Sequence, residues 1–519
     1  MDMTLGFKTY LSLRWACMLF CLLGLIQQPV VEARSWLVDD FGARPDGVST
    51  NTCFIQRAID AAAASGGGRV VFAHGIYMSG ALFLKSGVEL HLPKGTVLRA
   101  IQDTALYPEL PTRVAGIEMP WPAGLVNIYQ QTNVVVSGQG TIDGNGSYWW
   151  KQFWGEDHKG GMLKDYRDRG ERWAVDYDCK RVRAVAVYEC TNITVRQVTI
   201  NRSGFWSLAL IYSGWIKVDG VVIRANIGGF GPSSDGVDID SSHDILVQNC
   251  DVDCNDDDFC LKSGRDADGL RVNRPTENVI IRNCVAGAGG GMFTIGSETS
   301  GGIRNVEVSH LTAVGTSNGI RLKSARFRGG VVQNVFIHDI QMKGVGDALS
   351  FELNWNPAYS YVTLPPGVDT NRVPSYWLTL AEKVEPPDRG LPEFRDIIIS
   401  NVTATALGRA IFADGYANKP IHDIQLDNIF IHSSKAGSIN HAADWIMRNV
   451  VLTTPDGSNL TLRDAIDVGR PQALKMMVAG EKTALRAEAM PAPTARTSTH
   501  STQGKWSMLG DAVDGPANN

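Results

Sequence analysis

The sequence predicts an all-β protein that folds as a right-handed parallel β-helix, a solenoid, with a short capping helix near its N-terminus. Three observations predict this class. Strand-like runs recur at a roughly constant spacing, helical periodicity nearly vanishes between residues 65 and 460, and 54 glycines suit a chain that turns often. A chain of 519 residues is also too long for one ordinary compact core, so an elongated repeat fold or two domains are expected.

The N-terminus is typical of an export signal, which we assign to residues 1–33. Lys8 and Arg14 precede the apolar run 15–26, and a small-x-small cleavage site ends at Ala33. The apolar run is too short for a secure membrane span, and a buried core helix is the alternative. We therefore expect a mature chain that is secreted or periplasmic and has no membrane contact once the signal is removed.

Residues 52–64 are predicted to form the capping helix. Its apolar residues recur at helical spacing: Phe54, Ile55, Ala58, Ile59 and Ala62. Asn51 or Thr52 can cap its start, and the glycines 66–68 stop it. Because a solenoid exposes apolar side chains at each end, this helix is expected to cover one open end.

The strand-like runs that follow define the repeat. Eight of them begin with Asn192, Trp215, Asp244, Asn278, Asn305, Asn334, Asp396 and Asp423. Their starts are 23 to 34 residues apart, except for one interval of 62 that is either two periods or one coil with an insertion at 351–392. A propeller blade needs about 40 residues and four strands, and a leucine-rich repeat needs intervening helices, so a parallel β-helix fits best.

We expect two parts in the mature chain. The β-helix should span residues 34–460 and carry the catalytic groups. Residues 461–519 form a C-terminal extension, in which 461–489 can form a helix and 491–519 has the Ala, Pro, Thr and Ser composition of disordered segments.

Acidic residues crowd the stretch 233–264, inside the β pattern. Asp235 and Asp256 are 21 residues apart, close to one coil, and coils stack at about 4.8 Å. Asp235 is therefore expected to stand beside Asp256 and Asp257 on the next coil. Adjacent carboxylates raise one another's pKa, which suits proton transfer. The alternative is a solvated acidic loop that is not an active site.

Two cations lie further along the chain, at Arg321 and Lys323. They share one strand face because side chains alternate along a strand. Cations beside carboxylates suit the binding of an acidic polymer, since Arg and Lys hold carboxylate groups. A salt-bridged surface pair is the alternative.

An ordered set of motifs carries a resemblance to a family. These motifs are Asp235-Gly236-Val237-Asp238, Asp256-Asp257 with Lys262-Ser263-Gly264, Ile295-Gly296-Ser297, and Arg321-Leu322-Lys323. Together they resemble the polygalacturonase family of pectin-degrading glycoside hydrolases (glycoside hydrolase family 28), over about residues 36–455. The resemblance implies a right-handed parallel β-helix that hydrolyses pectic polymers with inversion, without a metal or an organic cofactor.

The resemblance also implies roles for single residues. Asp256 matches the general acid, and Asp235 and Asp257 match the pair that activates water. Arg321 and Lys323 match the residues that hold the substrate's uronate carboxylate.

The two neighbours of the acid pair are also expected in the substrate site. Asn255 can orient the acids by hydrogen bonding, and Asp258 stands where the family often has a small residue. A one-residue slip in register would make the acid pair Asp257 and Asp258. Inverting enzymes need roughly 6.5–9.5 Å between acid and base.

One departure from the family concerns a histidine. The usual Gly-His-Gly is Gly289-Gly290-Gly291 here, which leaves galacturonan and rhamnogalacturonan-type substrates both open. Long aromatic-rich segments at 148–177 and 351–392 either wall a groove or simply cover the β-helix.

Three classes of function therefore compete: a pectic hydrolase, a calcium-dependent pectate-lyase-type enzyme, and a non-catalytic β-helix that binds polysaccharide. Paired aspartates with Arg-x-Lys favour the hydrolase. A formal net charge of −5, without clustered Lys and Arg, argues against a nucleic-acid partner. We expect a monomer whose partner is a pectic polysaccharide or oligosaccharide.

Overall fold

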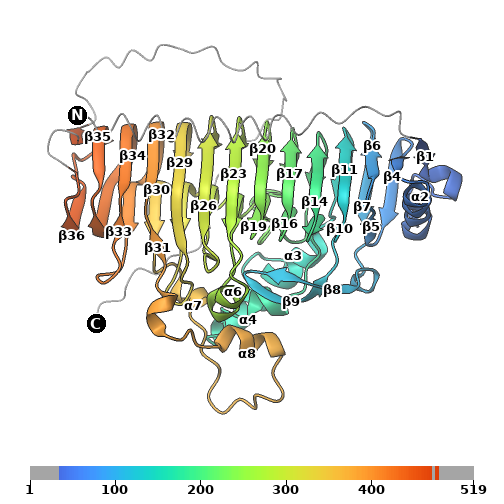
Figure 1. The fold of residues 1–519 in the computed structure, drawn as a ribbon, viewed down its shortest axis with the longest axis horizontal. Coiled ribbons are helices and arrows are strands. Elements are labelled where there is room, and N and C mark those ends of the chain that lie inside the picture. The colour runs from blue at the N-terminus through green and yellow to red at the C-terminus, as the bar shows by residue number, and fades with distance from the viewer. Residues whose placement is uncertain (1–33, 470–473, 479–519) are drawn as a thin grey trace, which may run out of the picture.

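Parallel strands stack coil upon coil, and every strand but two in the described part of the chain belongs to this stack (Figure 1). The computed structural model describes residues 34–469 and 474–478, and for 474–478 the backbone alone. The proposed export signal and most of the C-terminal extension lie outside these residues. None of the helices in the described part of the chain is long and apolar enough to cross a membrane.

Each coil contributes strands to three faces of the solenoid. The first face contains β1 (Ser35–Leu37), β3 (Gly68–Val71), β6 (Val88–Leu92), β11 (Thr132–Gly138), β14 (Thr191–Arg196), β17 (Gly214–Asp219), β20 (His243–Gln248), β23 (Thr276–Arg282), β26 (Ile303–Ser309) and β31 (Glu393–Phe394). The second face contains β2 (Asp46–Thr50), β4 (Gly75–Ser79), β7 (Thr96–Ala100), β12 (Thr141–Asp143), β15 (Thr199–Asn201), β18 (Val222–Arg224), β21 (Asp251–Asp253), β24 (Val285–Ala286) and β27 (Thr312–Val314).

The third face positions the candidate site. It contains β5 (Leu82–Leu84), β10 (Val126–Tyr129), β13 (Val185–Tyr188), β16 (Leu208–Ile211), β19 (Val237–Asp240), β22 (Asp257–Lys262), β25 (Gly291–Ile295), β28 (Asn318–Lys323), β30 (Asp347–Glu352) and β36 (Thr461–Ile466). Near the C-terminus, long strands bend from one face to the next: β29 (Val331–Val345), β32 (Ile397–Asp414), β34 (Ile424–Ala443) and β35 (Ile446–Thr454). The short β33 (Ile421–His422) and β37 (Leu474–Val478) complete the stack.

The pairing between strands confirms the repeat that the sequence predicted. The residues after the eight starting positions pair in one continuous ladder: Ile193, Ile216, Ile245, Val279, Val306, Val335, Ile397 and Ile424. Val335 pairs directly with Ile397, so the interval of 62 residues is one coil with an insertion. The parallel β-helix predicted from the sequence is thus the architecture of the chain.

Asparagine and aspartate begin these runs because the backbone there is left-handed. Asn278, Asn305 and Asn334 have φ angles of 58°, 57° and 55°. Their side chains also bond from coil to coil: Asn305 Nδ2 donates to Asn278 Oδ1 at 3.1 Å, and Asn334 Nδ2 donates to Asn305 Oδ1 at 3.4 Å. Asn and Asp tolerate this conformation better than other residues with a side chain, so the motif reports a turn.

The N-terminal capping helix α2 (Thr52–Ala64) has the predicted bounds. Ile55, Ala58, Ile59 and Ala62 are buried against the first coils. The predicted cap differs in detail, because the Asn51 side chain accepts from the Arg44 N–H and donates to Ser49 instead of bonding a helix N–H.

Helical structure after residue 65 is more frequent than the sequence predicted. The short helices inserted between strands after residue 65 are η2 (Thr104–Leu106), α3 (Ser147–Trp154), α4 (Gly161–Asp168), α5 (Val175–Asp178), α6 (Asp266–Val272), α7 (Pro357–Ser360), α8 (Ser375–Ala381) and η3 (Pro387–Gly390). One more short helix, η1 (Val38–Phe41), precedes α2. With the antiparallel hairpin β8 (Glu109–Val114) and β9 (Ile117–Pro122), most of them gather on one side of the solenoid (Figure 1). They are too short to show helical periodicity in a sequence window.

The helix expected at 461–489 is wrong where the structure describes it. Residues Thr461–Ile466 form β36, which pairs with β34, and Leu474–Val478 form β37, which pairs with β35. The exposed edge of the last full coil offers unpaired backbone groups, and strand addition satisfies them. The predicted disordered tail, 491–519, lies outside the described residues.

We expect the asparagine ladder to stabilise the stack. Replacing Asn305 by Ala should lower the free energy of unfolding by about 1–2 kcal/mol, because a non-glycine residue in the left-handed region costs this much and the ladder bonds are lost as well. Asn305→Gly removes the same bonds without the conformational cost and should destabilise less. Urea denaturation of both variants measures the difference, and equal midpoints would contradict the role of the left-handed turn.

Candidate active site

The site lies on the third face, where strand alternation separates an apolar interior from a charged exterior. In β19 and β22 the interior residues Ile239 and Leu261 pair with each other, and both are completely buried. The alternate residues pair as Asp238 with Cys260 and as Asp240 with Lys262. Charged groups from successive coils are therefore brought within one coil spacing of each other on the outer face.

Three aspartates meet at this face, as the coil spacing predicted. The pairing of Val237 with Phe259 places the turn before β19 beside the turn before β22, and the Gly236 N–H donates to the carbonyl of Asp257 at 2.9 Å. One carboxylate oxygen from each of Asp235, Asp256 and Asp257 lies within 4.8 Å of the others.

Several cations surround the carboxylate of Asp257. Its Oδ2 accepts from Lys323 Nζ at 2.9 Å and its Oδ1 accepts from the Thr294 hydroxyl at 2.7 Å, while Arg321 Nη1 lies 3.8 Å from Oδ1. Burial by itself raises the pKa of this carboxyl, but Lys323, then Arg321 and Lys262, lower the pKa below its usual range. Asp257 is accordingly an ionised base throughout the mildly acidic range.

Asp235 and Asp238 have the opposite tendency. Burial first, and then the carboxylates of Asp238 and Asp256, raise the pKa of Asp235 well above its usual range against the opposing charge of Lys262. Burial likewise raises the pKa of Asp238 to about 7, opposed by Lys262. Environments that raise the pKa of one carboxyl and lower the pKa of its neighbour are typical of paired acid and base groups.

Lys262 joins these acids to a second buried carboxylate. Its Nζ lies 3.5 Å from Asp235, 3.4 Å from Asp238 and 3.8 Å from Glu298. Burial opposes ionisation of Glu298, but the neighbouring cations, Lys262 foremost, lower its pKa to about 2. The lysine therefore remains charged and balances the crowded acids, which burial alone would not permit.

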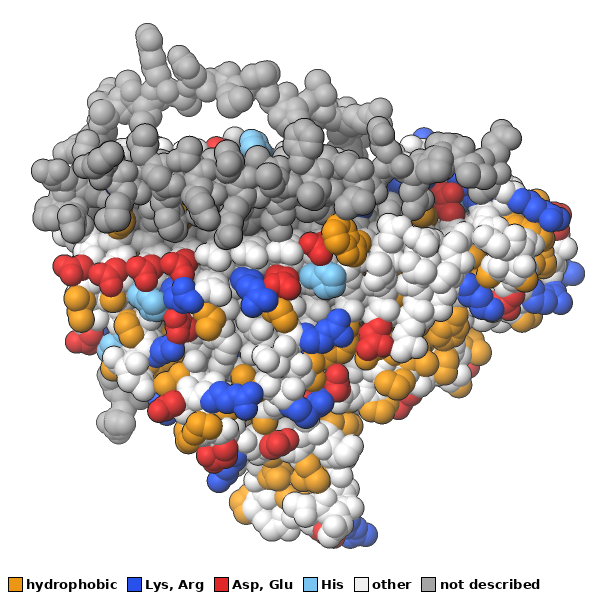
Figure 2. Space-filling view, viewed as in Figure 1, with side chains coloured by type: hydrophobic (Ala, Val, Ile, Leu, Met, Phe, Trp, Pro, Cys, Tyr) orange, Lys and Arg blue, Asp and Glu red, His pale blue; other side chains and the backbone are white. Residues whose placement is uncertain are grey.

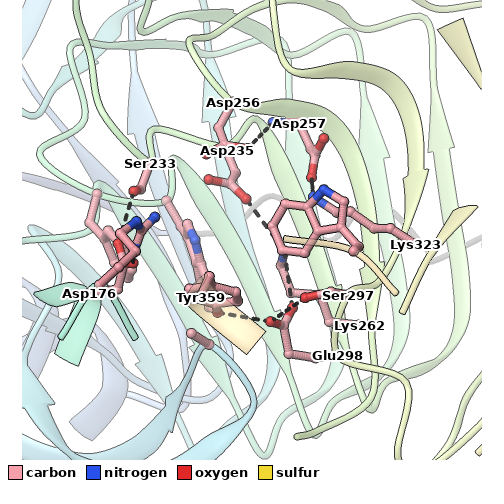
Figure 3. Close-up of a pocket in the computed structure, with 15 residues that line it drawn as sticks. Asp176, Ser233, Asp235, Asp256, Asp257, Lys262, Ser297, Glu298, Lys323 and Tyr359 are labelled. Atoms are coloured by element: carbon pink, nitrogen blue, oxygen red, sulfur yellow. Dashed lines mark hydrogen bonds and ion pairs between the residues drawn. The ribbon is translucent and has the colours of Figure 1, made fainter. Parts of the chain in front are cut away.

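A cavity opens over these groups, and Figure 3 shows how they surround it. Fifteen residues line it: Ala115, Arg172, Asp176, Phe205, Trp206, Ser233, Asp235, Asp256, Asp257, Lys262, Ser297, Glu298, Lys323, Trp355 and Tyr359. Lys323 Nζ lies 4.3 Å from the centre of the Trp355 ring. The indole and the ammonium together offer a charged, amphipathic wall of the kind that contacts sugars.

The structure does not bring all seven sequence-predicted residues to this cavity. Asp235, Asp256, Asp257 and Lys323 line it. Arg321 lies against Asp257 and 5.3 Å from the Trp355 ring, behind the lining, so that the expected shared face of Arg321 and Lys323 is observed.

Asn255 and Asp258 lie outside the lining. The backbone N–H of Asn255 donates to the Ser234 hydroxyl, and the residue is not part of the cavity lining. Asp258 is completely buried and accepts from the Cys254 thiol at 3.3 Å. The geometry therefore favours Asp256 and Asp257 as the acid pair over the register shifted by one residue.

Several lining residues were not predicted. Lys262 and Ser297 belong to the quoted motifs, and the alternation of β22 could have placed Lys262 on the outer face. Glu298 directly follows Ser297, without a signal of its own. Arg172 and Asp176 belong to a segment between strands, and only tertiary contacts bring them to the site.

The two aromatic-rich segments have different roles. Trp149 and Trp150 of α3 are buried against the solenoid, so this part of 148–177 covers the β-helix. Trp355 and Tyr359 of the insertion line the cavity, as the groove-wall alternative predicted.

Comparison with known proteins agrees with this geometry. Residues 120–373 match the model of the family described as "Glycosyl hydrolases family 28". A probable polygalacturonase of Vitis vinifera is 28% identical over 394 residues, which cover 73% of this chain and 76% of the relative. An endo-polygalacturonase of Pectobacterium carotovorum subsp. carotovorum is 25% identical over 415 residues, which cover 78% of this chain and 88% of the relative.

A solved structure extends the likeness to the fold. The exopolygalacturonase of Thermotoga maritima superposes with a TM-score of 0.66 at 26% identity, over 86% of this chain and 96% of that one. The solenoid is thus the right-handed β-helix that the sequence predicted. The chain is a glycoside hydrolase that is similar to the proteins of glycosyl hydrolase family 28.

Proposed function

We propose that this protein hydrolyses the glycosidic bonds of pectic polysaccharide, with galacturonan as the substrate and a rhamnogalacturonan-type polymer as the alternative. The observation that carries the proposal is the group of three aspartates facing one cavity, with Lys323 held at 2.9 Å from one of them. The names of the relatives support a pectic substrate. The expected export signal supports action outside the cell, where such polymers occur.

The proposed reaction uses the aspartates as a proton donor and a proton acceptor. Asp256 donates its proton to the glycosidic oxygen as the bond from that oxygen to the anomeric carbon breaks. A water molecule attacks the same carbon and gives its proton to ionised Asp257. The proton balance is restored when Asp257 releases its proton to solvent and Asp256 takes one up.

Asp235 is placed to hold the attacking water beside Asp257. Its raised pKa keeps it protonated where Asp257 is ionised, so that one carboxyl can donate to the water and the other can accept from it. The same raised pKa makes Asp235 the alternative proton donor to the leaving oxygen.

The stereochemical outcome needs a separate argument, because the aspartate oxygens lie within 4.8 Å, closer than the 6.5–9.5 Å expected for inversion. Spacing alone would favour retention. The resemblance to glycoside hydrolase family 28 implies inversion, and each oxygen of Asp257, although bonded to Thr294 or to Lys323, keeps a lone pair that can accept a proton from water. We therefore propose inversion, with water as the nucleophile.

Two other functions fit the site less well. A calcium-dependent lyase needs oxygen ligands that are open to the ion, since Ca²⁺ takes six to eight oxygens. Here Lys262 and Lys323 lie 2.9–3.5 Å from the carboxylates that would bind it, and their charges repel a second cation. A purely polysaccharide-binding β-helix would not need carboxyls of opposite pKa tendency buried in one cavity.

The first prediction concerns the proton donor. Asp256→Asn should lower kcat on polygalacturonate by about 10²–10⁴, because a general acid contributes a factor of that order. Substrate binding and the circular dichroism spectrum should be retained. Asp235→Asn is the matched comparison: near wild-type turnover in Asp256→Asn together with a large loss in Asp235→Asn would assign the donor role to Asp235.

The second prediction concerns the base. Lys323→Met removes the foremost cation that lowers the pKa of Asp257, so this pKa should rise. Because Asp257 must be ionised to accept a proton, the acid limb of the kcat/KM profile should move to higher pH. Loss of a charge-assisted hydrogen bond should lower kcat/KM about ten- to a hundredfold.

The exposed Lys343 in β29 provides the matched control, and Lys343→Met should leave the pH profile unchanged. An acid limb that stays in place in Lys323→Met would show that Lys323 does not set the pKa of Asp257.

The third prediction concerns stereochemistry. Proton NMR of the earliest product should show the anomeric configuration opposite to that of the cleaved bond, since water attacks directly. A first product with the original configuration would instead indicate a covalent intermediate and the retaining mechanism that the short carboxylate spacing favours.

A further inference from the structure

A buried glutamate, Glu298, shares the lysine that lies beside the catalytic aspartates. Lys262 Nζ lies 3.4 Å from Asp238, 3.5 Å from Asp235 and 3.8 Å from Glu298. Figure 3 shows these contacts, which join Lys262 to Asp235 on one side and to Glu298 on the other. A direct bond from an ammonium to a carboxylate is about 2.7–2.9 Å long. Lys262 therefore stands among three carboxylates at longer distances than a direct bond to any one of them.

Neighbours on several sides fix the carboxylate of Glu298. Its Oε1 accepts from the hydroxyl of Tyr359, in α7, at 3.0 Å and from the hydroxyl of Ser297 at 3.0 Å. The tip of the β8–β9 hairpin packs against the same side chain, where a Cβ added at Gly116 would lie 2.6 Å from Glu298 Cγ. Glu298 is only 3% exposed. Its carboxylate is therefore held in one place beside Lys262.

Glu298 is also ionised in the range where the aspartates exchange protons. Burial opposes its ionisation, but the cations around it, Lys262 foremost and then Arg328, Lys323 and Arg265, lower its pKa to about 2. It has no part in the proposed proton transfer. Lys262 is thus attracted at all times to a carboxylate that does not take or give a proton in the reaction.

The two aspartates of the proposed reaction that bind water differ in how a lysine meets them. Asp257 accepts directly from Lys323 at 2.9 Å, and its pKa is lowered. Asp235 has only the shared Lys262, at 3.5 Å, and its pKa is raised, first by burial and then by Asp238 and Asp256. The distance to the lysine therefore separates the ionised carboxyl from the protonated one.

Acidic groups outnumber cations around Asp235. The titratable and charged side chains that face it from β19, from the turn before β22 and from β22 itself are Asp238, Asp256, Asp257, Cys260 and Lys262. Lys262 is the cation next to its carboxylate. The position of that one ammonium accordingly decides whether Asp235 keeps its proton.

Resting on the proposed function, we propose that Glu298 is a positioning residue for the reaction. It holds the ammonium of Lys262 away from a direct ion pair with Asp235, so that Asp235 keeps the proton with which it orients the attacking water. The same consequence holds if Asp235 is instead the donor to the leaving oxygen, because that role also needs its proton. Glu298 thus acts through Lys262 and not by contact with the reacting atoms.

The experiment measures kcat/KM on polygalacturonate against pH for the wild type, Glu298→Gln, Glu298→Asp and the matched control Glu118→Gln. The amide oxygen of Gln can still accept from Tyr359 and Ser297, so Glu298→Gln removes the charge alone. Glu118 in β9 is an exposed carboxylate that pairs with Arg271 at 2.6 Å and does not line the cavity. Circular dichroism and Tm check that each variant folds.

Infrared titration of the proteins without substrate gives a second readout that does not rely on activity. Buried protonated carboxyl groups have a resolved band, and the band of Asp235 is the one missing from Asp235→Asn.

We expect the alkaline limb of kcat/KM to move to lower pH in Glu298→Gln, by about one pH unit. The sign follows because Lys262 approaches Asp235 and lowers its pKa, so that Asp235 loses its required proton at lower pH. Above the limb kcat/KM should fall about tenfold, and the infrared titration of Asp235 should move in the same direction. Glu298→Asp keeps the charge farther from Lys262, so its limb should lie between the other two. Glu118→Gln should behave as the wild type.

Other outcomes overturn the proposal. If the limb and the infrared titration of Asp235 stay in place in Glu298→Gln, Glu298 does not control Asp235. An equal loss of kcat/KM at every pH, with an unchanged titration, would show that Glu298 only supports the cavity. If Glu298→Gln does not fold, Glu298→Asp decides, and an unshifted limb in that variant contradicts the proposal. A wild type that cleaves no pectic polymer overturns the proposed function itself, whereas the infrared titration still tests the effect of Glu298 on Asp235.

Discussion

Hydrogen bonding between stacked coils is the interaction on which the rest of this structure depends. Each strand of the third face pairs in parallel with the strand one coil before and one coil after it, so a residue's neighbours in space are set by register. Because the coil spacing is that of paired strands, about 4.8 Å, any side chain repeated at one position becomes a ladder. Isoleucine and valine form such a ladder inside, and asparagine forms one at the turn.

The same stacking explains both the reactivity and the electrostatic strain of the site. Asp235 and Asp257 lie at the same register position of neighbouring coils, so their carboxylates are close together. Burial adds to the free-energy cost of ionising both. The neighbouring cations decide which carboxyl is ionised. Lys323 and Arg321 stabilise the charge of Asp257, whereas Asp235 shares Lys262 with Asp238 and Glu298 and has the raised pKa.

The additions to the solenoid provide what a regular stack cannot. A flat face of parallel strands offers a groove that is open at both ends, which suits binding anywhere along a polymer. Here the segment 171–178 and the insertion 351–392 meet over that face and bond to each other through Asp178, Tyr376 and Trp377. These additions supply Arg172, Asp176, Trp355 and Tyr359 to the cavity lining. Asp235 and Asp256 lie in the turns before β19 and β22, and Asp257 begins β22.

Much of this protein could be read from its sequence, because the repeat is a local pattern. The spacing of the Asn-led runs determined the solenoid, and the register of Ile193 to Ile424 follows it without a break. The helix at 52–64 has caps and periodicity of its own. The approach of Asp235 to Asp256 and Asp257 also follows from the length of one coil.

What the sequence could not determine depends on contacts outside the repeat. Arg172 and Glu298 carry no motif, and only tertiary packing brings them to the cavity. The difference between Asp257, which lines the cavity, and Asp258, which does not, depends on how the chain enters β22. The pKa values of the acids depend on burial and on cations from other coils. The sequence by itself determined the stacking and which carboxylates meet, because both follow from coil length. The tertiary structure decided which of them is charged and which loop residues line the cavity, because electrostatics and loop packing act between residues distant in the chain.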